Sequence, residues 1–378
     1  MASYLSYAID KQAEIVALIR ELVECESPSN APQEVNRFVN LLIEKTRGLA
    51  SAETVDSDGF GSHLRLEFNL PGRQDGQVLL LGHSDTVWPS GTLASMPFRE
   101  GEGRLWGPGV LDMKAGLAFA IYAVRILRDL DVTVRRKIVM LVVSDEEVGS
   151  PSSRPLTERE ARKSDCVLVL EPGTGLTGKL KTARKGVGNY SLLVQGKAAH
   201  AGVDFGKGAS AIVEAARQVE KIAGFTDLSS GITVNPGTIS GGTRTNVVAA
   251  EATVGIDIRV ERLLDAEVLD RKFRSLTPFD NRCSLRIEGG LNRPPMERTQ
   301  AIANLFARAQ RMGAEMGISL EESSTGGGSD GNFTAALGVA TLDGLGAVGE
   351  GAHAQNESVL IDRIADRTAL LATLLASA

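Results

Sequence analysis

The sequence is poor in cysteine, in aromatic residues and in long apolar runs. Three cysteines occur among 378 residues, far apart and without a CxxC pair, which argues against a disulfide framework and a thiolate zinc site. Aromatic residues make up 4% of the chain, too few for a platform that stacks bases or sugars. No apolar run approaches the ~20 residues that span a bilayer, and charged residues stand where a secretory signal needs an apolar core. We therefore expect a cytoplasmic protein without membrane contacts.

Basic residues are also fewer than acidic residues. Lys and Arg number 41 against 47 Asp and Glu, so the net charge is −6, and we expect no nucleic-acid partner. Apolar residues at 43% and charged residues at 23% are typical of globular proteins. At about 150 residues per domain, the length predicts two or three domains.

Short apolar runs alternate with helical stretches in the first half of the chain. Residues 78–81, 138–143 and 166–170 are continuously apolar, as expected of strands buried on both faces. Residues 115–130, between the first two runs, have helical spacing. This alternation predicts an α/β domain with a mostly parallel sheet flanked by helices.

The pattern changes between residues 182 and 290. Six segments follow in the order strand, helix, strand, strand, helix, strand, which is the order of a ferredoxin-like α+β unit. They are expected at 187–195, 209–223, 231–239, 246–260, 263–276 and 283–288. We therefore predict an inserted domain of residues 182–290 between the two parts of a larger domain, residues 1–181 and 291–378.

Histidine and carboxylate residues follow the buried runs. His83 comes directly after the first run, Glu146 and Glu147 after the second, and Glu171 after the third. Because ligands bind outside the carboxyl ends of parallel strands, we expect these side chains to lie together. Asp112, in a glycine-rich turn before a helix, is a further candidate.

This combination of side chains favours a metal site. A single carboxylate at a strand end is more often merely solvated, but clustered carboxylates repel one another unless cations lie among them. Three carboxylates and two neutral imidazoles suit two divalent metal ions with a bound hydroxide. Without thiolate ligands, zinc is favoured, with Co²⁺ or Mn²⁺ as alternatives.

Two competing motifs are weaker. Residues 327–331 match the GxSxG nucleophile elbow, and Asp343 and His353 follow in the hydrolase order. However, no apolar strand precedes Ser329, and the chain beyond it is short for that fold. Residues 206–211 imitate a dinucleotide-binding loop, but no strand precedes them.

In their order and spacing, the motifs resemble the di-zinc aminoacylase and glutamate carboxypeptidase family, most closely its carboxypeptidase G members. The matching segments are GHSDTV at 82–87, residues 107–116, DEEVG at 145–149, LEP at 170–172 and GAH at 351–353. The resemblance covers nearly the whole chain. It implies a zinc-peptidase-like catalytic domain and an inserted ferredoxin-like lid through which the chains form homodimers.

The resemblance also implies a role for each ligand candidate. Asp112 resembles the carboxylate that bridges two metals. His83 and Glu171 would complete one metal site, and Glu147 and His353 would complete the other.

Three further residues resemble the family's catalytic machinery. Asp85 resembles the carboxylate that orients His83, a role also expected from the physics of metal sites. Glu146 resembles the general base that takes a proton from the metal-activated water. His200 resembles the lid histidine that stabilises the oxyanion, either in its own subunit or across the dimer.

A last group resembles the substrate-binding residues. Asn246 resembles the lid asparagine at the substrate, and Arg293 the arginine that binds the substrate carboxylate. Gly328 and Ser329 belong to a loop beside it, and Lys185 would add a second cation. For Arg293 and Lys185, the plain alternative is an ordinary surface charge.

The sequence thus predicts a metal-dependent amidohydrolase that cleaves an amide bond next to a free carboxylate, as a glutamate carboxypeptidase does. Its substrate would be a dipeptide or another small molecule. An N-acyl-amino-acid deacylase of the same family is the first alternative, and a catalytically inactive metal- or peptide-binding homologue is the second. Glu146 beside five ligand candidates disfavours the inactive homologue.

Overall fold

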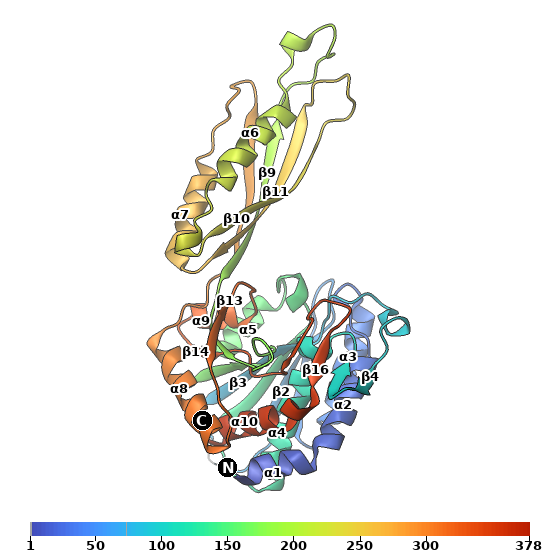
Figure 1. Ribbon diagram of the computed structural model, residues 1–378, viewed down its shortest axis with the longest axis vertical. Helices are drawn as coiled ribbons and strands as arrows, with labels where there is room; N and C mark the ends of the chain where they lie inside the picture. Colours follow the sequence, from blue (N-terminus) through green and yellow to red (C-terminus); the bar gives the residue numbers. More distant parts are fainter. Residues whose placement is uncertain (1, 73) are drawn as a thin grey trace. The chain divides into compact units, whose positions relative to one another are not determined.

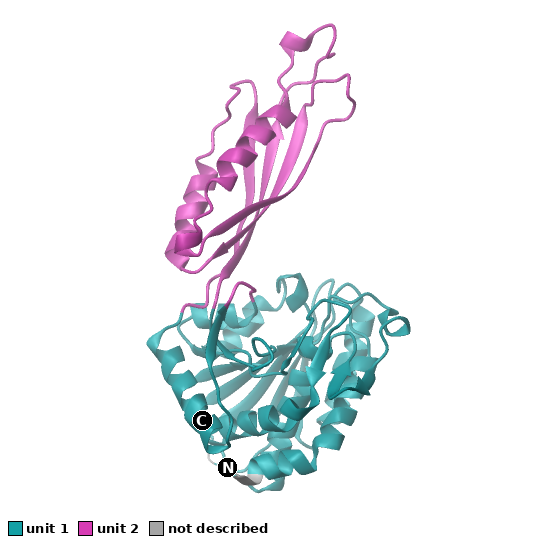
Figure 2. Ribbon diagram, viewed as in Figure 1, with its two compact units in different colours: residues 1–183, 298–324, 329–378 teal, residues 184–297, 325–328 magenta. Residues whose placement is uncertain are grey.

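The computed structural model describes residues 2–72 and 74–378, and the chain folds into two compact units (Figure 2). Unit 1 contains residues up to Ala183, Arg298–Ser324 and Ser329–Ala378. Unit 2 contains Arg184–Glu297 and the short segment Thr325–Gly328. The chain therefore leaves unit 1 and returns to it twice.

A six-stranded sheet forms the centre of unit 1 (Figure 1). Its strands, in spatial order, are β1 (Ala50–Val55), β2 (His63–Phe68), β6 (Lys137–Val143), β3 (Gln77–His83), β7 (Cys166–Val169) and β14 (Ala340–Leu342). The last four run parallel, while β1 and β2 are antiparallel at one edge. The prediction of a mostly parallel sheet flanked by helices is confirmed.

Both faces of this sheet are covered, which explains its continuously apolar strands. Val78 and Leu80 belong to a core cluster with residues of three helices of unit 1, within 12–24, 115–129 and 364–376. Leu79 and Leu81 belong to a cluster with residues of another helix, within 154–161. Successive side chains of a strand point to opposite faces, so residues 78–81 of β3 are all apolar. The helices of unit 1 are α1 (Ala2–Asp10), α2 (Gln12–Glu24), α3 (Pro32–Lys45), α4 (Ala115–Asp129), α5 (Arg154–Ala161), α8 (Gln300–Glu315), α9 (Gly331–Ala336) and α10 (Ile364–Ala376).

Two small sheets join segments that are distant in the sequence. One has the strand order β15 (Gly349–Glu350), β16 (Ser358–Leu360), β5 (Arg104–Trp106) and β4 (Arg99–Gly101). Within it, Ser358 pairs with Trp106, so the chain just before β16 lies beside the chain just after β5. The other sheet pairs β8 (Leu180–Arg184) with β13 (Glu322–Thr325).

Unit 2 has the expected ferredoxin-like topology. Along the chain it contains β9 (Gly186–Gln195), α6 (Ala211–Ala223), β10 (Thr233–Gly241), β11 (Glu251–Val260), α7 (Leu263–Arg274) and β12 (Ser284–Arg293). All neighbouring strands are antiparallel, in the spatial order β10, β11, β9, β12. Its core includes Tyr190 on β9 stacked on Phe273 of α7, with ring centroids 4.3 Å apart.

One expected strand is partly wrong. The pattern predicts a strand over 246–260, but β11 begins at Glu251 and Asn246 lies in a turn. Val248 and Ala249 are buried there, and Val247 forms only an isolated bridge to His200. The pattern misled because burial alone makes a loop as apolar as a strand. In the described residues, no helix is long and apolar enough to cross a membrane.

Candidate metal centre

Three neighbouring parallel strands end at the same edge of the unit 1 sheet, and each is followed by a candidate ligand. His83 is the last residue of β3 and pairs with Val143, the last residue of β6. A short helical turn, Glu146–Val148, follows β6. Glu171 comes two residues after the end of β7. The parallel arrangement therefore brings together the carboxyl ends that the sequence singled out.

The ring of His83 is buried and held in one orientation. Its Nδ1 lies 2.9 Å from the carbonyl oxygen of Asp85, and a carbonyl only accepts, so Nδ1 carries the hydrogen. In the neutral ring, Nε2 therefore keeps its lone pair for a ligand. It lies 3.2 Å from Oδ1 of Asp112 and 3.7 Å from Oε1 of Glu171.

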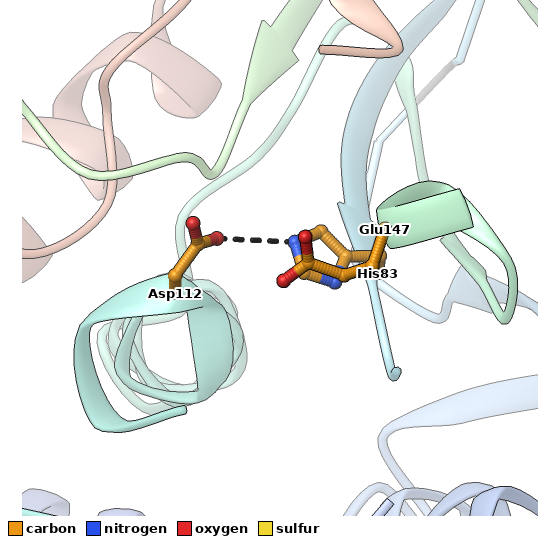
Figure 3. A group of neighbouring side chains, drawn as sticks. All are labelled: His83, Asp112 and Glu147. Atoms are coloured by element: carbon orange, nitrogen blue, oxygen red, sulfur yellow. Dashed lines mark hydrogen bonds and ion pairs between the residues drawn. The ribbon is translucent and has the colours of Figure 1, made fainter. Parts of the chain in front are cut away.

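Asp112 lies between two histidines. It belongs to the irregular helical segment Val110–Lys114, directly before α4. Oδ1 faces Nε2 of His83 at 3.2 Å, and Oδ2 faces Nε2 of His353 at 3.4 Å. Figure 3 shows Asp112 and His83 facing each other, with Glu147 beside His83. Two oxygens directed at two separate imidazoles are what a bridging carboxylate requires.

His353 and Glu147 lie on the other side of Asp112. Nε2 of His353 is 3.2 Å from Oε1 of Glu147. The backbone of His353 has a φ of 61°, a left-handed conformation that non-glycine residues adopt only rarely. About half of its side chain is exposed, so this part of the cluster is open to solvent.

The donor atoms fit a pair of divalent metals. One atom each from His83, Asp112 and Glu147 lie within 4.8 Å of one another, and so do atoms from His83, Glu146 and Glu171. The ligand types are imidazole nitrogen and carboxylate oxygen, which zinc, manganese and cobalt all accept. The two groups share His83, while Asp112 and Glu147 each also lie within 3.4 Å of Nε2 of His353.

The histidines and carboxylates shift one another's pKa. Hydrogen bonds to Asp112 and Glu147 raise the pKa of His353 to about 10. Burial opposes the charged form of His83, but its contacts with Asp112 and Asp85 outweigh burial and raise its pKa well above the ordinary value. Burial also opposes ionisation of Asp112, yet the two histidines hold its pKa well below the usual range. Metal binding at such a site releases the imidazole protons.

Asp85 connects the turn after β6 to the centre. It is 1% exposed, and its two carboxylate oxygens accept hydrogen bonds from the backbone N–H groups of Glu146 and Glu147, each at 3.2 Å. The hydroxyl of Ser29 donates to the same carboxylate at 2.7 Å. Asp85 therefore contacts His83 through its backbone carbonyl and, at 3.5 Å, through Oδ1 of its carboxylate. The same carboxylate also holds the backbone of the two glutamates.

The remaining predicted residues lie mostly in unit 2, in two groups at opposite ends of its sheet. Arg293 pairs with Val187 at the start of β9. Lys185 and Gly328 are at the same end: a Cβ on Gly328 would lie 2.9 Å from Cδ of Arg293. Nζ of Lys185 donates to the carbonyl of Gly231 at 2.6 Å, so part of its donor capacity is used within the unit.

His200 and Asn246 lie beyond the other end of β9. The N–H of Ala201 donates to the carbonyl of Asn246 at 3.0 Å, which joins their two loops. Both residues are exposed. β9 has ten residues, and at about 3.3 Å per residue its length is roughly 30 Å. His200 and Arg293 of one chain therefore cannot contact the same small molecule while unit 2 keeps this fold.

Ser329 belongs to unit 1 and is fully buried. Its hydroxyl donates to Oδ2 of Asp343 at 2.8 Å, while the ring of His353 faces Asp112 and Glu147. The GxSxG segment therefore forms no Ser–His pair of the hydrolase kind. The fourth histidine, His63, is buried on β2.

The sequence motifs did not include Glu357. This residue is fully buried and accepts four N–H hydrogen bonds, three of them from the backbone around Asp112. A glutamate in the polar stretch after His353 carries no signal that separates it from a solvated surface residue. Only the fold reveals its position.

Residues 79–377 match the model of peptidase family M20/M25/M40. The chain belongs to this family. The expected resemblance is thereby confirmed, and the protein is a hydrolase whose clustered histidine and carboxylate side chains could hold a metal ion.

Relatives of this M20/M25/M40 peptidase carry different activities in their names. Carboxypeptidase G2 of Pseudomonas sp. (strain RS-16) is 29% identical over 97% of this chain and 90% of its own length. Acetylornithine deacetylase of Klebsiella pneumoniae (strain 342) is 32% identical over 52% of this chain and 54% of its own. The crystal structure of aminopeptidase PepT from Bacillus cereus ATCC 10987 has a TM-score of 0.81 at 24% identity, covering 97% of this chain and 98% of that one. The three names state different reactions, so similarity alone does not give the reaction of this chain.

The position of Asp112 leads to a first prediction. Asp112→Asn removes a charge and replaces one oxygen by an NH₂ group, which cannot bind a metal. Elemental analysis should show that this variant binds at least one metal ion per chain fewer than wild type. Bound metal stabilises the folded state, so the thermal midpoint should fall as well.

Asp343→Asn is the matched control, because Asp343 is also buried but contacts Lys181 and Ser329 instead of histidines. It should retain the wild-type metal content. Two ions bound with wild-type affinity in Asp112→Asn would refute the bridging position.

Proposed function

We propose that this peptidase is an amidohydrolase with two zinc ions that cleaves an amide bond next to a free carboxylate, in the manner of a glutamate carboxypeptidase. Co²⁺ or Mn²⁺ are the alternative ions. The observation that carries this proposal is Asp112, whose two oxygens face His83 and His353 separately. His83 and Glu171 would hold one ion, and Glu147 and His353 the other.

The metals, when bound, polarise the scissile carbonyl and lower the pKa of the attacking water. Glu146 acts as the general base that accepts a proton from this water and passes it to the leaving nitrogen. Its backbone N–H is held by Asp85, and its carboxylate lies within 4.8 Å of the donor atoms of His83 and Glu171. The presence of this glutamate also argues against the inactive homologue.

Variants of the adjacent residues Glu146 and Glu147 test whether the first is the general base and the second a metal ligand. Glu146→Gln should keep both metals while kcat falls by ~10²–10⁴, the usual range for a lost general base. Glu147→Gln should instead lose metal, because Glu147 is a ligand. Kinetics and elemental analysis of the two variants separate the roles, and near-wild-type turnover of metal-loaded Glu146→Gln would contradict the assignment.

We propose Arg293 as the residue that binds the substrate carboxylate, beside Gly328 and the loop that leads to Ser329. Its side chain is buried next to Gly328, which restricts the guanidinium more than a surface position would. A guanidinium binds a carboxylate through two parallel hydrogen bonds, and a lysine cannot reproduce this geometry. Lys185 would attract a second carboxylate, which is the reason to prefer glutamate or aspartate as the released residue.

Arg293→Lys should therefore lower kcat/KM roughly tenfold or more, since a hydrogen bond to a charged group contributes ~1.5–3 kcal/mol. Amidation of the substrate's α-carboxylate should lower the kcat/KM of wild type by a similar factor and change that of the variant little. Arg286→Lys, on the same strand but exposed, is the control and should behave as wild type.

A comparison of substrates also distinguishes the carboxypeptidase from the alternative activities. If wild type hydrolyses free-acid and amidated substrates equally well, carboxylate recognition is wrong. If N-acyl-amino acids are hydrolysed without preference for acidic side chains, the deacylase alternative replaces the carboxypeptidase. The similarity to an acetylornithine deacetylase supports keeping that alternative.

We also propose that unit 2, whose main segment Arg184–Glu297 extends beyond the insertion predicted at 182–290, is a lid through which two chains form a homodimer. In this dimer, His200 and Asn246 serve the partner's site. The length of β9 between Arg293 and His200 supports this assignment. His200 would stabilise the oxyanion and Asn246 would contact the substrate. The two ends of one lid would then serve different active sites.

Mixed dimers test this arrangement. His200→Ala and Glu146→Ala homodimers should both be inactive. A dimer with one chain of each kind has one intact site if His200 acts across the dimer, and its activity should approach half that of wild type. If His200 acts within its own chain, both sites of the mixed dimer are damaged and no activity returns.

A further inference from the structure

Glu357 is a fully buried carboxylate on which four N–H groups converge. Oε2 accepts hydrogen bonds from the indole Nε1 of Trp88 at 2.8 Å and from the N–H of Gly109 at 2.9 Å. Oε1 accepts from the N–H groups of Leu111 at 2.9 Å and Asp112 at 3.1 Å. Such a set of donors suits an ionised carboxylate, which has only acceptor sites.

These contacts join three segments that carry candidate ligands. Trp88 follows the segment of His83, the three backbone donors belong to the segment of Asp112, and Glu357 itself is four residues beyond His353. The segment from His353 to Glu357 is compact, because the N–H of Glu357 donates to the carbonyl of Ala354 at 2.9 Å. It continues into β16, which pairs with β5.

We propose that Glu357 is the positioning residue that sets the spacing of Asp112 and His353, and thereby the affinity of the metal position that these two residues share with Glu147. This inference rests on the proposed two-metal function. Glu357 contacts neither the substrate nor a metal. It acts by holding the backbone of one ligand at a fixed distance from the segment of the other.

The negative carboxylate is required for this role. In Glu357→Gln, an NH₂ group replaces one oxygen and faces two N–H donors that it cannot satisfy. Leaving a buried donor without a partner carries a penalty, so the segment 109–112 should move away from the side chain. The position around Glu147 and His353 depends on Glu357 at two ligands, through the segment of Asp112 and through the short turn that joins His353 to Glu357. The position around His83 and Glu171 depends on it only through Asp112 and, five residues after His83, through Trp88, so it should be affected less.

Calorimetric titration of the metal-free full chain with Zn²⁺ tests the proposal. In Glu357→Gln, we expect one of the two zinc affinities to fall by about 10- to 100-fold, the range found when partners of metal ligands are altered, and the other to change less. The matched control is Glu160→Gln, because Glu160 is also buried but binds Arg65 and Lys163 of unit 1. It should lower the thermal midpoint and leave both zinc affinities at the wild-type values.

Amide hydrogen exchange of the metal-free protein gives a readout that does not depend on activity. The N–H groups of Leu111 and Asp112 should exchange faster in Glu357→Gln than in wild type, and at the wild-type rate in Glu160→Gln. If Glu357→Gln does not fold, Trp88→Phe serves instead. It removes one donor and keeps the carboxylate, and should weaken the same zinc affinity by a smaller factor.

A folded Glu357→Gln with both zinc affinities unchanged would overturn the proposal, and so would unchanged affinities in Trp88→Phe when Glu357→Gln does not fold. Failure of the proposed function looks different, because wild type itself would then bind no zinc or hydrolyse no amide. Wild-type binding and hydrolysis with an unaffected variant would refute only the positioning role.

Discussion

Repulsion among carboxylates at one edge of the unit 1 sheet is the constraint on which the rest of this structure depends. Asp112, Glu147 and Glu171 approach two buried or half-buried imidazoles within 3.2–3.7 Å. Without a counter-charge such a cluster would separate. The surrounding fold resists this separation through contacts that fix the backbone of the ligand segments. Among them are hydrogen bonds from backbone N–H groups to two further buried carboxylates, Asp85 and Glu357.

Close backbone packing provides part of this resistance. A Cβ on Gly116 would lie 2.3 Å from the carbonyl oxygen of Leu170, and one on Gly346 would lie 2.1 Å from the same atom. Two glycines thus allow the first turn of α4 and a later loop to approach the strand end that carries Glu171. Asp112 is directly before this turn of α4, so the glycine at 116 keeps the segments of Asp112 and Glu171 close.

The secondary structure was predictable where burial leaves a simple pattern. The strands β3, β6 and β7 are covered on both faces, and their apolar runs predicted both their positions and the parallel sheet. The pattern failed at residues 246–250, where Val248 and Ala249 are buried in a loop. It also gave no sign of the short strands β5 and β16, because two or three residues are too few for a period to be recognised.

The sequence by itself determined the fold class, because the burial of a strand on both faces leaves a continuous apolar run. Its motifs, through their resemblance to a known family, indicated the family and the residues of the proposed site. Tertiary structure decided which of those residues lie close together and which lie far apart. Only the fold places Asp112 between two histidines that are 270 residues apart in the sequence, and only the length of β9 separates His200 from Arg293. Glu357 could not be identified from the sequence for the same reason: its side chain accepts four hydrogen bonds from distant segments, and such contacts leave no local sequence pattern.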